Sequence, residues 1–194
     1  MIQRALAFLA HELDDYLGHR LATDPGKGVQ LTRLVDDQGV LAFAARVGMA
    51  LIRVDEERMF ASKQRVRIDD DTVTYLTQPE QALELHVIFV ARDSGQEFAY
   101  NEALHSLSRV VGFFQSRRSF TPANSPQMAD TGLVKLNIEL ETVDYEVQNH
   151  IWGSLGGKLL PSVLYLIRLV AIDESIVTGT ADPIDNINVR SARE

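Results

Sequence analysis

One segment near the C-terminal end, His150 to Asp173, most constrains how this chain of 194 residues can fold. It reads HIWGSLGGKLLPSVLYLIRLVAID and joins the end of an amphipathic helix to an almost unbroken apolar run. The pair Gly156–Gly157 is typical of a helix C-cap, because glycine adopts the left-handed backbone conformation at little cost. Pro161 then opens a strand from Val163 to Ile172, and Trp152 is expected in the core between helix and sheet. The segment carries no recognisable nucleophile, metal cluster or phosphate loop, and therefore indicates architecture rather than catalysis.

Hydrophobic periodicity predicts the remaining elements. Helices are expected from Ile2 to about Gly18, Tyr100 to Gln115 and Tyr145 to Leu155, and strands at Val29–Val35, Gly48–Val54, Leu83–Ala91 and Val134–Thr142. Val40 to Ala45 fits either a short strand or a helical turn. Lys63 to Glu80 is polar and predicts a long loop or a protruding hairpin through Val73 to Leu76.

This order of elements predicts one α/β (α+β) domain. We expect a mixed sheet of about four to six strands packed with three main helices. The predicted domain covers residues 1–173, and residues 174–194 are expected to form a polar C-terminal tail because they show no apolar periodicity.

Composition excludes several classes of protein. The contents of 45% hydrophobic and 24% charged residues are ordinary for a globular protein. A formal net charge of -8 argues against nucleic acid as the main partner, since affinity for phosphates comes largely from lysine and arginine. The absence of cysteine excludes disulfides and thiolate metal sites. The apolar run from Leu159 to Leu166 is far shorter than the roughly 20 residues of a bilayer span. These features, with no signal sequence recognised, predict a cytoplasmic protein without a membrane span.

Candidate catalytic groups do not form a recognisable motif. The histidines are scattered, with no pair at metal-binding helical spacing: His11, His19, His86, His105 and His150. Asp69 to Asp71 lacks the spaced ligands of a calcium loop. Gly156 to Lys158 follows a helix, whereas a phosphate loop precedes one. No serine lies in a nucleophile elbow. The sequence therefore predicts no enzyme activity, no cofactor and no metal.

Charged residues suggest where another subunit could bind. Arg168 interrupts an otherwise apolar strand, so its charge must be paired within the chain or presented to another subunit. Glu139 and Glu141 lie on the polar face of an alternating strand and face water or a partner. Arg117 and Arg118 belong to the polar stretch that follows the second helix.

Four stretches carry a family resemblance: LDDYL at the end of the first helix, VDEER after the second strand, YNEALHSLSRVVGFFQSRRSFTP, and WGSLGGKLLPSVLYLIRLV. On these the chain resembles the N-terminal domain of the tail-terminator, or cap, proteins of extracellular contractile injection systems. Such phage-tail-like particles are typified by the Photorhabdus virulence cassettes and the antifeeding prophage. The resemblance covers most of Met1 to about Ile172. Its most specific part marks six positions as structural: Trp152, Gly153, Gly156, Gly157, Pro161 and Tyr165.

The resemblance implies a phage tail-terminator-like fold and a structural role. Such a protein would assemble in the cytoplasm as a homo-oligomeric ring, expected to be a hexamer, on the baseplate-distal end of the inner tube and contractile sheath. There it would end polymerisation and fix length, within a particle that can be released from the cell. Subunit, tube or sheath contacts are expected at Arg168, Arg117, Arg118, Glu139 and Glu141. The alternatives are a small adaptor or assembly chaperone that binds one partner protein and leaves the particle, and a hydrolase with an unrecognised site.

Overall fold

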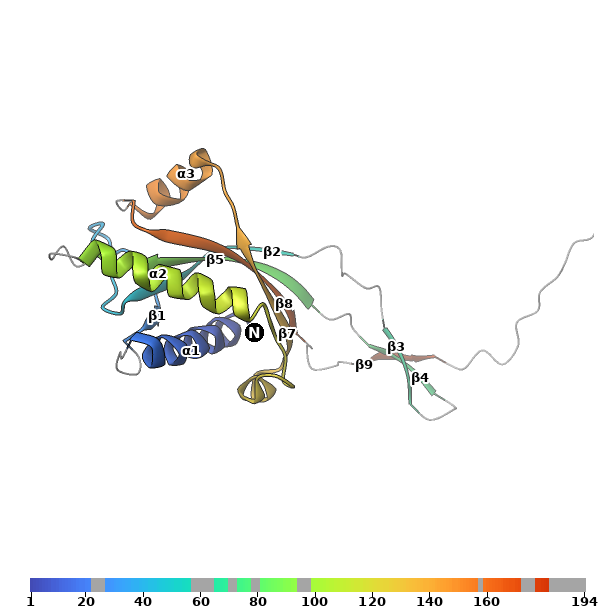
Figure 1. Ribbon diagram of the computed structural model, residues 1–194. Helices are drawn as coiled ribbons and strands as arrows, with labels where there is room; N and C mark the ends of the chain where they lie inside the picture. The colour runs from blue at the N-terminus through green and yellow to red at the C-terminus, as the bar shows by residue number, and fades with distance from the viewer. Residues whose placement is uncertain are drawn as a thin grey trace, which may run out of the picture.

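The computed structural model describes residues 1–21, 27–56, 65–69, 73–77, 81–93, 99–156, 159–171 and 177–181. Within these ranges the chain forms three α-helices, one 3-10 helix and nine strands (Figure 1). The helices are α1 (Ile2–Leu21), α2 (Ala99–Ser116), η1 (Pro126–Thr131) and α3 (Tyr145–Leu155). The strands are β1 (Val29–Leu31), β2 (Val47–Glu56), β3 (Arg65–Asp69), β4 (Val73–Thr77), β5 (Gln81–Ala91), β6 (Ser119–Phe120), β7 (Leu133–Glu141), β8 (Ser162–Ala171) and β9 (Val177–Ala181).

Six of these strands form one mixed sheet in the order β1-β2-β5-β8-β7-β6. β1 is parallel to β2, and all other neighbours are antiparallel. The long strands β5 and β8 lie at its centre and pair from Gln81↔Ala171 to Val90↔Ser162. The predicted α+β architecture, with a mixed sheet and three main helices, is confirmed.

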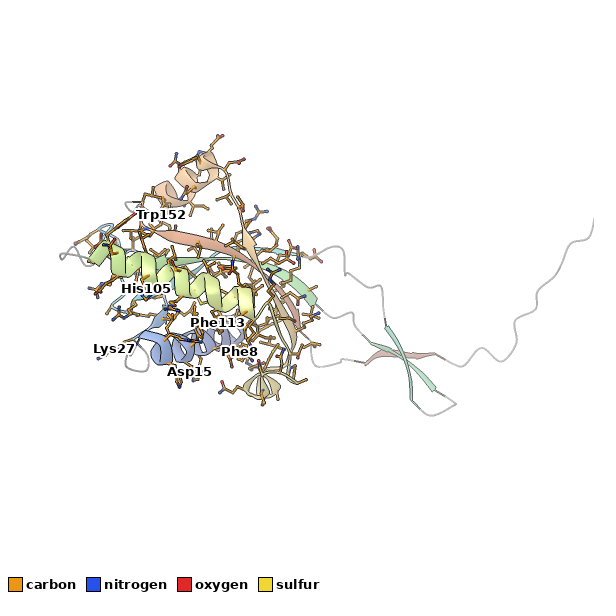
Figure 2. All side chains as sticks on the ribbon, in the orientation of Figure 1. Phe8, Asp15, Lys27, His105, Phe113 and Trp152 are labelled. Atoms are coloured by element: carbon orange, nitrogen blue, oxygen red, sulfur yellow. The ribbon has the colours of Figure 1, made fainter. Side chains whose placement is uncertain are left out.

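Helices α1 and α2 cover one face of this sheet, and α3 lies on the other (Figure 1). Leu9, Leu13 and Leu17 recur every fourth residue on α1 and are fully buried, as helical spacing requires for an amphipathic helix. Figure 2 shows Phe8 and Phe113 where α1 and α2 meet. The face of the sheet that α1 and α2 cover therefore holds the larger of two apolar clusters.

A single carboxylate joins the end of α1 to the start of β1. Asp14 Oδ1 accepts hydrogen bonds from the backbone N–H groups of Gly28 and Val29, each at 2.8 Å. A Cβ atom at position 28 would lie 2.8 Å from the same oxygen, so this approach requires glycine. The LDDYL stretch thus positions the first edge of the sheet.

The smaller apolar cluster lies under α3 on the opposite face. Trp152 is 4% exposed and packs with Leu34, Phe43, Ile88 and Val90. Figure 2 shows its side chain between α3 and the sheet. The helix ends at Gly156 in the left-handed conformation (φ 67°), where the backbone N–H donates to the carbonyls of Trp152 and Gly153. The predicted helix C-cap is thus present at this glycine.

The buried face of α2 differs from the one predicted. Helical periodicity over Tyr100 to Gln115 predicts Leu104 in the core and Ser106 on the polar face, but Leu104 is 39% exposed and Ser106 is 2% exposed. The helix packs against both α1 and β5, so its buried arc is centred on Ala103, Ser106 and Val110. The serine is tolerated because its Oγ donates to the carbonyl of Glu102 at 2.9 Å.

Residues 40–45 are neither strand nor helix, apart from an isolated bridge between Val35 and Leu41. This segment instead supplies Phe43, 5% exposed, to the cluster under α3.

A second, three-stranded sheet stands apart from the first (Figure 1). We call it the arm sheet; its order is β3-β4-β9, with both pairs antiparallel. Its hairpin, β3 and β4, is the protruding hairpin that the polar stretch predicts. Its third strand falls within residues 174–194, so part of the predicted tail pairs as a strand with β4. The domain boundary at residue 173 stays a prediction.

Candidate assembly interface

Arg168 joins three strands on the face of the sheet beside α3. Its Nε lies 3.1 Å from Oε1 of Glu84 on β5, and its Nη1 lies 2.6 Å from Oε1 of Glu139 on β7. The arginine side chain is 29% exposed and that of Glu139 is 56% exposed, so water screens the pairs. Arg168 is therefore paired within the chain, and its role as an intersubunit contact stays a prediction.

His86 makes a second set of pairs on the same face. Its Nδ1 lies 2.8 Å from Oε2 of Glu141 and its Nε2 lies 3.1 Å from Oδ2 of Asp55. A carboxylate only accepts hydrogen bonds, so both contacts are satisfied together when the ring carries both protons. Arg53 donates to Asp55 at 2.9 Å, and this hydrogen bond is the main cause that lowers the pKa of the Asp55 carboxyl below its usual value.

These side chains form a charged ladder across β2, β5, β8 and β7. Its members are Arg53, Asp55, Glu84, His86, Glu139, Glu141 and Arg168. They pair with one another along the sheet and form a partly exposed charged surface. Within the described ranges, no group of three or more histidine or carboxylate side chains is placed to hold a metal ion. None of the described helices is long and apolar enough to cross a bilayer.

The two arginines after α2 lie in different surroundings. Arg117 donates to Oε2 of Glu12 at 2.5 Å and to Oγ of Ser125 at 2.7 Å, and its guanidinium lies 4.7 Å from the centre of the Phe120 ring. These contacts join α1 to the segment after α2, which makes Arg117 part of the fold. Arg118 is exposed and lines a cavity beside β7. An interface role for either residue stays a prediction, and the geometry favours Arg118.

The outer edge of β7 is covered only in part. β6 pairs with Leu136 and Asn137, and the carbonyl of Arg118 accepts from the N–H of Ile138 at 2.8 Å. Backbone groups alternate along a strand, so the N–H and C=O of Leu140 point to the same side as those of Ile138. No strand of the described chain lies beside them there. The sheet therefore has an open edge at Leu140.

The alternation of apolar and polar residues from Val134 to Thr142 predicts that Leu140 faces the core with Val134, Leu136 and Ile138, and this prediction is wrong. Leu136 and Ile138 are buried, but Leu140 is 55% exposed. The reason is that a cavity of about 320 Å³, lined by Val111 of α2 among others, separates Leu140 from the helix.

A second cavity lies on the other face of the same edge. It measures about 260 Å³ and is lined by Leu140, Val143, Ile151 and Trp152 among others. The indole Nε1 of Trp152 is buried and has no hydrogen-bond acceptor among the described residues. An unpaired buried donor costs roughly 1 to 3 kcal/mol. We call the open edge of β7 at Leu140, with its two flanking cavities, the edge groove. The periodicity of β7 gave no signal for it.

The other residues expected to be structural have varied surroundings. The carbonyl of Pro161 accepts a hydrogen bond from the N–H of Ala91 at 3.0 Å, next to the end of the pairing between β5 and β8. The ring of Tyr165 lies 4.8 Å from that of Phe114, and burial raises the pKa of its hydroxyl to about 12. A Cβ atom on Gly153 would meet nothing within 4 Å, so no steric reason requires glycine there. Gly157 lies outside the described residues.

The fold and the ladder define an α+β domain whose charged groups pair with one another across a sheet. Residues 5–186 match the family model described as the Pvc16 N-terminal domain, and the chain belongs to this family. The resemblance recognised in the sequence is thereby confirmed.

Two solved structures share the fold. One is the sheath/tube terminator of an extracellular contractile injection system, PVC, in its extended state; it is 13% identical, with a TM-score of 0.57 over 94% of this chain and 62% of that chain. The other is the tube-terminating cap of the anti-feeding prophage, 14% identical, with a TM-score of 0.56 over 92% of this chain and 60% of that chain. The chain thus spans less than two thirds of either protein. No curated protein sequence shows significant similarity.

Proposed function

We propose that this protein is a structural cap, or tail terminator, of a contractile phage-tail-like injection particle. It forms a ring, a hexamer, on the baseplate-distal end of the inner tube and sheath, where it ends polymerisation and fixes length. The observation that supports this most is the fold shared with two terminator proteins over 94% and 92% of the chain. The particle assembles in the cytoplasm and can then be released from the cell.

The physical requirements of capping agree with this role. A growing tube end exposes an interface that recruits the next ring, and only a protein that binds this end without repeating the interface stops addition. Closure into a ring lets about six weak contacts act together through their high effective concentration. A net charge of -8 suits basic surfaces on the tube or sheath proteins. The mutually paired ladder supports a structural, non-enzymatic role.

Deleting the gene and measuring particles by electron microscopy tests the proposal. We expect tubes and sheaths of altered, non-uniform length with unchanged tube diameter and baseplate form, and the parent gene supplied in trans should restore a uniform length. Normal, uniform lengths in the deletion strain would refute the capping role.

Copy number separates the cap from an adaptor or assembly chaperone. A cap remains in purified particles at about six copies per tube end, as a closed ring requires. Quantitative mass spectrometry of purified particles measures this ratio against the baseplate proteins. A protein that is lost during purification would instead be an adaptor.

A further inference from the structure

We propose that β3 of one copy adds as a strand to the outer edge of β7 in the neighbouring copy. This inference rests on the proposed ring and names the contact that builds it. The edge groove is the acceptor, and the outer edge of the arm sheet is the donor.

The acceptor has the features of a strand-addition site. Peptide N–H and C=O groups of Leu140 face outward beyond the end of the pairing with β6. Recognition by strand addition takes its affinity from such main-chain groups and its specificity from pockets for alternate side chains. The two cavities lie on opposite faces of this edge, one toward α2 and one toward α3, and Leu140 lines both.

Strand geometry explains why two cavities are needed. Successive side chains of an added strand point to opposite faces of the sheet. One side chain would therefore enter the cavity beside Val111 and Phe114, and the next would enter the cavity beside Trp152.

The donor follows from charge complementarity. β3 is an outer strand of the arm sheet, because the order of that sheet is β3-β4-β9. Its sequence, Arg65 to Ile68, alternates basic with apolar residues. The acceptor edge alternates in the same way, with Leu140 between Glu139 and Glu141. In one register of addition, Val66 lies beside Leu140, and Arg65 and Arg67 lie beside the two carboxylates.

The carboxylates can accept a further cation. Glu139 is paired with Arg168, yet its side chain remains 56% exposed. The ladder has four carboxylates, those of Asp55, Glu84, Glu139 and Glu141, against two arginines and one histidine, so it keeps at least one net negative charge. Arginines from a neighbouring copy would compensate this negative charge.

A second copy of the chain is the fitting occupant, because each copy carries both donor and acceptor on different surfaces. Such a head-to-tail contact repeats from subunit to subunit and closes into a ring when the rotation allows it. The arm sheet stands apart from the six-stranded sheet of its own chain (Figure 1). The proposed pairing would join it to the six-stranded sheet of the neighbouring copy as one continuous sheet.

Disulfide trapping tests the contact, since the chain has no cysteine of its own. Leu140→Cys protein is mixed with Val66→Cys protein, and separately with Ile68→Cys protein to cover a shifted register, and each mixture is oxidised. We expect cross-linked heterodimers on non-reducing gels. The matched control replaces Val66→Cys by Thr178→Cys, on the opposite outer strand of the arm sheet, and should give at least tenfold less product.

The same pair in one chain reports on the assembled particle. The Val66→Cys/Leu140→Cys variant should give a series of cross-linked oligomers within purified particles. Equal cross-linking of the β9 control, cross-links only within single chains, or none in particles that contain the protein would overturn the proposal.

A single substitution provides a second measurement. Leu140→Asp should weaken self-association at least tenfold by light scattering while the thermal midpoint stays near that of the parent, because Leu140 is 55% exposed. Tyr145→Asp, at a side chain that is 82% exposed, is the control and should leave association unchanged. Unchanged association of Leu140→Asp would refute strand addition. The proposed capping role would still be tested separately, by the particle lengths in the deletion strain.

Discussion

Replacing Trp152 by alanine should destabilise the fold strongly. The indole is 4% exposed and packs with Leu34, Phe43, Ile88 and Val90 under α3. Truncating a buried tryptophan costs roughly 3 to 5 kcal/mol of unfolding free energy. Removing the ring also removes its unpaired Nε1, a burden of roughly 1 to 3 kcal/mol, which places the expected loss near the lower limit of about 3 kcal/mol.

Thermal unfolding followed by far-ultraviolet circular dichroism measures this loss, because Trp152 is the sole tryptophan and the variant has no tryptophan fluorescence to follow. For a chain of this size, about 3 kcal/mol lowers the midpoint by roughly 6 to 12 °C. Trp152→Phe should fall between parent and alanine variant, since it keeps an apolar ring and removes the unpaired donor. Tyr145→Ala, on the exposed side of the same helix, is the control. A midpoint of Trp152→Ala within about 2 °C of the parent would refute the packing argument.

Three further predictions concern the arm sheet, the ladder and an acidic turn. Deleting Glu174–Glu194 removes β9 and should leave the six-stranded sheet folded by circular dichroism while particle lengths become less uniform; loss of folded protein would show that the sheet depends on this segment. Arg168→Met should cost about 1 kcal/mol in urea unfolding, because two partly exposed carboxylates lose their cation, and adding Glu84→Gln should recover part of it. Backbone hydrogen bonds lower the pKa of Asp36 below 3.8, so its stabilising contribution is present above about pH 4 and is lost as the pH falls through the folded pKa. Asp36→Asn should therefore show a smaller loss of urea midpoint than the parent between about pH 6 and pH 2, and equal losses would contradict this.

Local signals predicted the elements whose ends are fixed by the chain itself. The bounds of α3, Tyr145–Leu155, agree with the prediction because Gly156 ends the helix in a left-handed conformation. α1 runs past Gly18 to Leu21, since one glycine is tolerated within a well-packed helix. β9 was missed because its sequence, VTGTA, has no apolar alternation and its partner β4 lies about a hundred residues away.

The charged ladder depended on register, which the sequence did not reveal. Arg168 drew attention as a charge within an apolar strand, but its partner Glu84 is 84 residues away and becomes a neighbour only through the pairing of β5 with β8. His86 was one of five scattered histidines, and its contact with Glu141 spans 55 residues. The sequence thus singled out Arg168, Glu139 and Glu141, and strand pairing brought them together with the other members of the ladder.

The sheet face beside α3 has two halves, and their difference affects how selectively the edge groove can bind a partner. α3 covers an apolar half, in which Trp152 and Ile88 are buried. The uncovered half carries the ladder, whose charges pair among themselves. Apolar exposure beside this half is concentrated at Leu140, where the backbone is also unpaired. A partner must therefore match both the hydrogen bonding of the edge and the cavities beside it, which restricts binding to an extended strand and makes the contact selective for one neighbour.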